Sequence, residues 1–176
     1  PIKKMKQALT ESENKYRVLF DNAILGIFRS TPTGQYLDIN PAFSHIAGYN
    51  SPEEMMSEIH EIGSQLYVRP DDREQIGELL ATSGEIHGFE TEIMHRSGKP
   101  IWISINARGV KDDAGHILWY EGTIEDITLR KLADIELSRK NEELQSTLEE
   151  LSGAEEELKE QLNEVFSVRS EIEERE

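Results

Sequence analysis

Alternating apolar and polar residues mark the middle of the chain as strands. Residues 87–95, 100–110 and 116–127 each alternate, and the turn sequences Ser97-Gly98 and 112–115 separate them. An apolar period of two is typical of a β-strand with two different faces, and Gly and Asp are common turn residues. The pattern therefore predicts three consecutive antiparallel strands joined by short turns.

A strand hairpin and several short helices are predicted upstream of these strands. Residues 24–29 and 36–39 have an extended pattern on either side of the turn Pro32-Thr33-Gly34. Between this hairpin and Gly84 the chain carries helix start signals, in which a capping residue precedes Pro or Pro opens an acidic first turn. These signals are Asn40-Pro41, Ser51-Pro52 and Pro70-Asp71-Asp72-Arg73, the last opening a helix to about Ser83.

The predicted strands have two distinguishable faces. On the 100–110 strand, Ile101, Ile103, Ile105 and Ala107 share one face, and Trp102, Ser104 and Asn106 share the other. On the last strand, Leu118, Tyr120, Gly122 and Ile124 are expected to point inward together. An interior Gly in a strand usually marks a close approach, so we expect Gly122 to face a pocket or a packed helix. Both faces need cover: the short helices on one, and the N-terminal helix or a second subunit on the other.

The two ends of the chain have helical spacing. Residues 1–23 are predicted to be a helix, with Thr10 and Glu13 in the spacing of a capping box. Its apolar residues Leu9, Tyr16, Leu19 and Phe20 fall roughly on one face. Residues 129–176 have no Pro and one Gly, and Leu recurs every seven residues. We therefore divide the chain into an N-terminal amphipathic helix (1–23), a mixed domain (24–128) and a C-terminal helix (129–176).

The C-terminal helix is predicted to form a parallel dimeric coiled coil of about five heptads. One row of the seam is Leu137, Leu144, Leu151, Leu158, Val165 and Ile172, at position d. The other row is Asn141, Leu148, Glu155, Leu162 and Arg169, at position a. Leu at d with a single Asn at a favours two strands in register, whereas the charged residues at a oppose association. We expect the coiled coil to be weak and able to shift between packings.

The junction between strand and helix carries its own signal. Asp126 and Thr128 are both good helix N-caps, and Arg130 lies one turn into the helix. A pair between Asp126 and Arg130 would fix the angle at which the helix leaves the domain. The alternative is a simple cap followed by solvated basic residues.

The composition and charge of the chain exclude several classes of partner. The formal net charge is −16, and residues 129–176 hold seven basic against fifteen acidic side chains, so nucleic acid and anionic membranes are not expected partners. No Cys is present, and no run approaches the roughly 18 apolar residues of a membrane span. We expect a segment of a longer protein, because the chain begins at Pro1 and ends within a heptad. The expected location of this segment is the cytoplasm, and a membrane-anchored parent protein is left open.

These elements together resemble the PAS domain family of sensor modules over about residues 13–131. The resemblance rests on Asp126-Ile127-Thr128 with Arg130-Lys131, Asn40-Pro41-Ala42-Phe43 followed by Gly48-Tyr49, Pro70-Asp71-Asp72-Arg73, and the Gly98 turn with Trp102 after it. It implies an α+β fold: a five-stranded antiparallel sheet, with the last strand between the first and the 100–110 strand, flanked by short helices. A pocket is expected between sheet and helices.

The resemblance also implies candidate pocket residues, which either line a cavity or fill the interior. They are Phe28, Asn40, Phe43, Ile46, Phe89, Ile103, Ile105, Tyr120 and Gly122. No cofactor is predicted. Cysteinyl-flavin requires the missing Cys, and the haem-binding relatives use a His on the helix that here follows Pro70, where 71–83 have none. Non-covalent flavin or another small ligand stays open. The His spacing fits no helical metal site, so no metal is expected.

The chain is not expected to be an enzyme. The carboxylate pairs Asp71-Asp72 and Glu90/Glu92 fit a helix first turn and a solvated strand face better than acid–base chemistry. No phosphate-binding loop appears, and no His follows His116. We expect a sensory module that binds a small ligand or partner and signals through a homodimeric coiled coil, with the N-terminal helix as a second contact, to an output domain such as a histidine kinase. The alternative is a ligand-free dimerisation and spacer module.

Overall fold

The structure is a computed structural model that describes residues 2–175. By its internal contacts the chain separates into two units, one ending at Leu129 and the other beginning at Arg130. The first unit holds one sheet and its helices, and the second is a single helix. The two units are described separately below.

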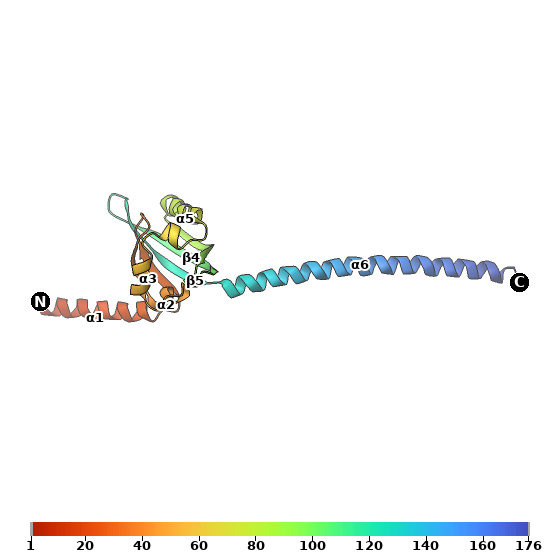
Figure 1. Cartoon of the computed structure of the whole chain (residues 1–176), viewed down its shortest axis with the longest axis horizontal. Helices are drawn as coiled ribbons and strands as arrows, with labels where there is room; N and C mark the ends of the chain where they lie inside the picture. Colours follow the sequence, from red (N-terminus) through yellow and green to blue (C-terminus); the bar gives the residue numbers. More distant parts are fainter. Residues whose placement is uncertain (1, 176) are drawn as a thin grey trace. The chain divides into compact units, whose positions relative to one another are not determined.

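The predicted elements are present in the predicted order (Figure 1). The helices are α1 (Ile2–Asp21), α2 (Pro41–Ile46), α3 (Pro52–Glu58), α4 (Ile62–Gln65), α5 (Pro70–Ser83) and α6 (Thr128–Glu173). The strands are β1 (Gly26–Ser30), β2 (Tyr36–Ile39), β3 (Glu85–Met94), β4 (Pro100–Lys111) and β5 (Ile117–Asp126). They form one antiparallel sheet in the order β2-β1-β5-β4-β3, which confirms the predicted α+β fold.

The core lies between the inner face of the sheet and helices α2 to α5. Ile103 and Ile105 of β4 and Ile124 of β5 are buried there, against Phe43 of α2 and Leu80 of α5. Their alternation along each strand is the reason why one face of the sheet is closed. The short helix α4 was not predicted. It is capped by the carboxylate of Glu61, which accepts from two backbone N–H groups of the helix.

The inward face of β5 differs from the prediction at one end. Leu118 is 48% exposed, whereas its neighbour Ile117 packs against the core. The cause is a register shift: Val110 of β4 pairs with Trp119, but the next residue, Lys111, pairs with Ile117, so Leu118 is an extra residue on β5. A bulge reverses which residues face inward beyond it, and an alternating sequence does not reveal its position. The expectation that Leu118 points inward was wrong.

The N-terminal helix also differs from the prediction at Thr10. Helix α1 already begins at Ile2, so Thr10 lies in its interior and its hydroxyl donates to the carbonyl of Lys6 at 3.0 Å. Thr10 is therefore not an N-cap, because an N-cap residue needs non-helical backbone and this one continues a helix. Near the other end of α1, Tyr16 and Phe20 stack with ring centroids 5.6 Å apart, and Phe20 is buried.

Gly122 meets a neighbouring strand instead of a helix. A Cβ atom at this position would collide with the backbone oxygen of Asn106 and lie 2.9 Å from the Cβ of Ala107, the residue it pairs with on β4. The close approach was predicted, but its partner was not. The reason is that β4 and β5 come together here more tightly than two ordinary residues permit.

We expect Gly122→Val to lower the free energy of unfolding by about 1–3 kcal/mol, because the added side chain must push β4 aside. Gly77→Ala is the matched control, since nothing lies within 4 Å of a Cβ built there. In a helix interior that change is expected to be stabilising by roughly 0.5–1 kcal/mol. Urea denaturation of both variants measures the difference, and equal stability of Gly122→Val and the parent would disprove the close approach.

A single buried amide connects the first elements of the domain. The Oδ1 atom of Asn40 accepts from the N–H groups of Ile27 (2.8 Å) and Phe43 (3.0 Å). Its Nδ2 atom donates to the carbonyls of Phe20 (3.1 Å) and Leu25 (3.0 Å). An Asn amide has two acceptor positions and two donor protons, and all of them are used here. Asn40, which is fully buried, thus ties α1, β1 and α2 together.

Asn40→Ala is therefore expected to be far more destabilising than the loss of a cap alone, by about 2–4 kcal/mol, because buried backbone groups lose their partners. Asn40→Asp keeps both acceptor positions but places a carboxylate against two carbonyls, so we expect it to destabilise as well. Asn14→Ala, on the exposed side of α1, is the control and should change stability by less than about 0.5 kcal/mol. The assignment would be contradicted if thermal unfolding showed that Asn40→Ala loses no more stability than the removal of a helix cap alone.

Candidate functional site

A small interior cavity lies between the sheet and the helices. Its volume is about 20 Å³, which is room for one water molecule. Five of the predicted pocket residues line it: Phe28, Phe43, Ile103, Ile105 and Tyr120. Three rings in its wall meet edge to face, with Tyr36 5.4 Å from Phe43 and 6.5 Å from Phe28. In this conformation the interior is almost completely filled by its own side chains.

The other predicted pocket residues lie elsewhere. The amide of Asn40 is used by the backbone contacts described above. Ile46 and Phe89 are partly buried against the core, and Gly122 is outside the lining of this cavity, although its position borders the open hollow on the other face of the sheet. The structure therefore brings the aromatic and β4 candidates together around the cavity and leaves these four outside its lining.

Polar residues in the cavity wall were not among the candidates. They are Ser30, Tyr36, Tyr67 and Arg73. The guanidinium of Arg73 lies over the ring of Tyr120, 5.4 Å from its centroid, and donates to the carbonyl of Thr31 at 3.4 Å. Burial raises the pKa of Tyr67 to about 12 and that of Tyr36 well above its ordinary value, while the positive charge of Arg73 acts in the opposite direction on both. The cavity thus has apolar walls and one cationic side.

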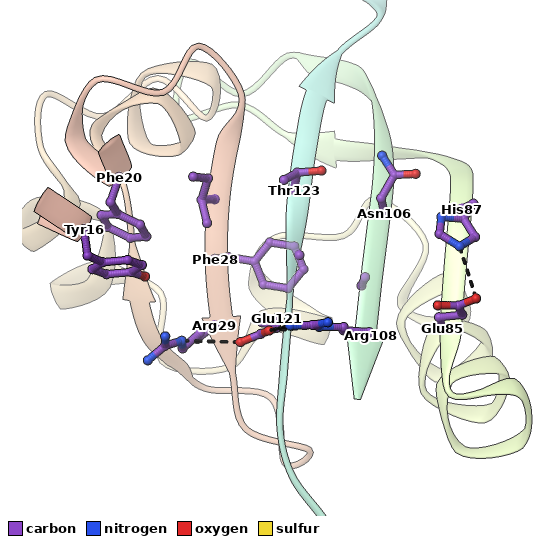
Figure 2. Close-up of a pocket in the computed structure, with 13 residues that line it drawn as sticks. Tyr16, Phe20, Phe28, Arg29, Glu85, His87, Asn106, Arg108, Glu121 and Thr123 are labelled. Atoms are coloured by element: carbon purple, nitrogen blue, oxygen red, sulfur yellow. Dashed lines mark hydrogen bonds and ion pairs between the residues drawn. The ribbon is translucent and has the colours of Figure 1, made fainter. Parts of the chain in front are cut away.

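The outer face of the sheet holds a wider and more open hollow of about 520 Å³ (Figure 2). Tyr16 and Phe20 of α1 border it on one side. On the sheet, Glu121 of β5 lies between two cations, 3.7 Å from Arg29 Nε and 2.7 Å from Arg108 Nη2. The hydrogen bond from Arg108 lowers the pKa of Glu121 and keeps it charged. This face was expected to be covered by the N-terminal helix or a second subunit, and in the described chain the end of α1 covers only part of it.

The junction between β5 and α6 is fixed to the neighbouring strand. Asp126 Oδ1 accepts from the N–H of Thr128 at 2.9 Å, at the first residue of α6. The N–H of Ile127 donates to the carbonyl of Trp102 at 2.9 Å, and the N–H of Trp102 donates to Thr128 Oγ1 at 3.0 Å. Both backbone groups of Trp102 therefore hold the start of the helix. The predicted pairing of Asp126 with Arg130 stays a prediction.

Helix α6 is continuous over 46 residues. All of its predicted seam residues are exposed in the single chain, and the apolar ones are 48 to 64% accessible. Two of the charged seam residues have partners within the helix. Glu155 lies 3.0 Å from Lys159 Nζ, and Arg169 Nε lies 3.0 Å from Glu173.

Among residues 2–175 no group of His, Asp or Glu side chains is arranged to hold a metal ion. Within the same range, none of the helices has the length and apolar character needed to span a bilayer.

The comparisons with known proteins agree on one protein family. A family model described as PAS domain matches residues 21–129. The sensor histidine kinase TmoS of Ectopseudomonas mendocina is 26% identical over 143 residues, which are 78% of this chain and 14% of that protein. The methyl sulfide methyltransferase-associated sensor of Methanosarcina acetivorans is 30% identical over 129 residues, 73% of this chain and 12% of that protein. The chain thus spans a small part of each relative.

Solved structures agree with this. A sensory box histidine kinase/response regulator from Burkholderia thailandensis is 26% identical, with a TM-score of 0.57 over 74% of this chain and 98% of that one. A domain of a sensory box sensor histidine kinase/response regulator from Geobacter sulfurreducens is also 26% identical, with a TM-score of 0.52 over 67% of this chain and 96% of that one.

We expect Thr128→Val to loosen the junction without unfolding the sheet. The change keeps the shape of the side chain but removes the acceptor for the Trp102 N–H, at a cost of about 1–2 kcal/mol. Hydrogen exchange followed by NMR should show faster exchange at the amides of Trp102 and Ile127. Thr147→Val on the exposed part of α6 is the control, and an unchanged exchange rate at Trp102 would show that the hydroxyl does not hold the junction.

Proposed function

The chain belongs to the PAS domain family, and from that premise we propose that it is the sensory module of a larger signalling protein. The PAS fold is sensory rather than catalytic, so this segment acts on its neighbours through conformation. In the proposal, a change in the domain passes through α6, as part of a dimeric coiled coil, to a C-terminal output domain. A histidine kinase is the output that the named relatives suggest. A cytoplasmic setting belongs to the same proposal, because a kinase output needs ATP.

One observation carries the proposal: α6 combines an exposed apolar seam with a fixed attachment to the sheet. A helix of this length with a row of Leu residues in water is unfavourable alone, and a second copy of the same helix covers the row. At its other end, the backbone of Trp102 and the carboxylate of Asp126 form hydrogen bonds with Ile127 and Thr128 at the start of the helix. A shift of β4 or β5 would therefore move the start of the coiled coil.

The charged seam residues support a dimer of limited stability. Glu155 would face its own copy across a parallel seam, and so would Arg169, which opposes association. Each lies beside an oppositely charged residue four positions later, Lys159 and Glu173, and these pairs draw the charges toward the rim of the seam. Asn141 fixes the register of the two helices but lowers the stability of the dimer. The seam is therefore suited to switching between packings of similar energy.

The N-terminal helix supports a second dimer contact. Its exposed apolar residues recur at intervals of three, four or seven positions along α1: Ile2, Met5, Leu9, Tyr16 and Leu19. This is the spacing of a coiled-coil stripe, and a second copy of α1 is the partner of matching length. The domain would then lie between two dimer contacts.

The small interior cavity favours the alternative, a ligand-free dimerisation and spacer module. A volume of about 20 Å³ admits no metabolite unless the walls move. Native mass spectrometry of the purified protein separates the two functions. A retained small molecule supports sensing of a ligand, whereas a mass equal to that of the bare chain under every expression condition supports the spacer.

The coiled coil is tested by Glu155→Leu. Filling this seam position with an apolar residue removes the like-charge contact, so the dimer should tighten by about tenfold or more in sedimentation equilibrium. Glu157→Leu is the matched control, because position 157 lies outside the seam and the change should leave the association constant unaltered. Removal of residues 132–176 should weaken or abolish dimerisation. A parent that stays monomeric at high micromolar concentration, or a Glu155→Leu variant that associates no more tightly, would refute the coiled coil.

A further inference from the structure

Arg73 is the cation that lines the interior cavity. Unlike Arg29, Arg69, Arg96 and Arg108, it forms no ion pair with any described residue. Its contacts are the face of Tyr120 and the carbonyl of Thr31. The side chain is partly buried and lines the interior cavity. Hydrogen bonds from Ser64 lower the pKa of Glu61, and the charge of Arg73 adds to this effect, so that carboxylate balances Arg73 in part without forming a direct ion pair. A bound anion would add a direct counter-charge to this partly buried guanidinium.

The acidic residues near Arg73 are occupied by other partners. Asp72 pairs with Arg69 and accepts a hydrogen bond from Thr91. Glu61 accepts from the backbone of Gly63 and Ser64 at the start of α4. Both carboxylates serve the local structure, so the guanidinium keeps free donor capacity for a planar partner.

We propose that the interior cavity is the site of a small carboxylate with an apolar body, and that Arg73 binds its carboxylate group. This inference rests on the proposed sensory function and names the chemical class of its ligand. The apolar body would lie among the walls that Phe28, Phe43 and Ile105 provide. The phenols of Tyr36 and Tyr67 line the same cavity, and burial keeps both protonated at neutral pH, so they are donors to an anion.

A carboxylate larger than water needs more space than the cavity now has. Helix α4 is the smallest element of its wall, with four residues, and it contributes Ile62 to the lining directly. It is held at one end by the hydrogen bond from Ile62 N–H to the carbonyl of Gly34 (2.8 Å) and by the Glu61 cap. At the other end of α4, the carbonyl of Leu66 accepts from the N–H of Met94 in β3 at 2.7 Å. Displacement of α4 about this end would enlarge the cavity beside Arg73. Binding of the ligand would then select the open form.

The test compares benzoate with benzamide on the whole chain by isothermal titration calorimetry. The two probes have nearly the same shape and differ in charge. We expect benzoate to bind about tenfold more tightly than benzamide, because it alone forms a charge-assisted fork with Arg73. This comparison needs no variant. Equal affinities, or no heat from either probe up to about 10 mM, would overturn the proposal.

Two substitutions then locate the site. Arg73→Gln should abolish the preference for benzoate, whereas Arg69→Gln, which removes the same charge from the exposed pair with Asp72, should retain it. Full retention of the preference in Arg73→Gln would exclude the cavity as the site. If Arg73→Gln does not fold, Arg73→Lys keeps the charge but removes the planar fork, and it should weaken benzoate binding without affecting benzamide.

The outcomes separate this inference from the proposed function. A parent that dimerises as expected but shows no benzoate preference would refute the carboxylate site and leave signalling through α6 intact. A parent that prefers benzoate but stays monomeric would support the site and refute the coiled coil.

Discussion

The structure of the domain depends on the four hydrogen bonds of one buried amide, that of Asn40. Helix α1 ends, β1 begins and α2 begins around this side chain. Strand β1 then pairs with β5 in the centre of the sheet, and β5 leads directly into α6. The first elements of the domain are therefore held together by a residue that the sequence marks as a helix cap and a pocket candidate, not as a connection between elements. An amide can satisfy both strand and helix at one point because it donates and accepts equally.

Local chemistry explains what the sequence predicts well. The strands follow from alternation, and the starts of α2 and α3 follow from Asn40 and Ser51, because a cap acts within a few residues of itself. The errors have equally physical causes. Leu118 is exposed because a bulge in the pairing of β4 with β5 reverses the face, and Thr10 is helical because helix already precedes it. Both depend on the surroundings of a residue and not on its type.

The same distinction applies to the cavity. Its aromatic and aliphatic walls were predictable, since Phe43 and Ile103 are apolar residues on inward faces. Its polar side was not predictable from the sequence. Arg73 appears in the sequence as the fourth residue of a helix start, and Tyr67 lies in a connecting segment without a strong pattern. They meet only because α5 packs against the sheet, a long-range contact that no local periodicity encodes.

The unbroken helix from Thr128 onward has a consequence for building chimeric receptors. Each residue inserted or deleted in α6 turns everything beyond it by about 100° around the helix axis, whereas seven residues restore the orientation to within about 20°. Trp102 holds the start of the helix through Ile127 and Thr128, so an insertion farther along α6 leaves these hydrogen bonds unchanged. A fusion of α6 to a foreign effector domain should therefore be made at whole heptads. A series of one-residue insertions would rotate that effector domain about the helix axis in regular steps.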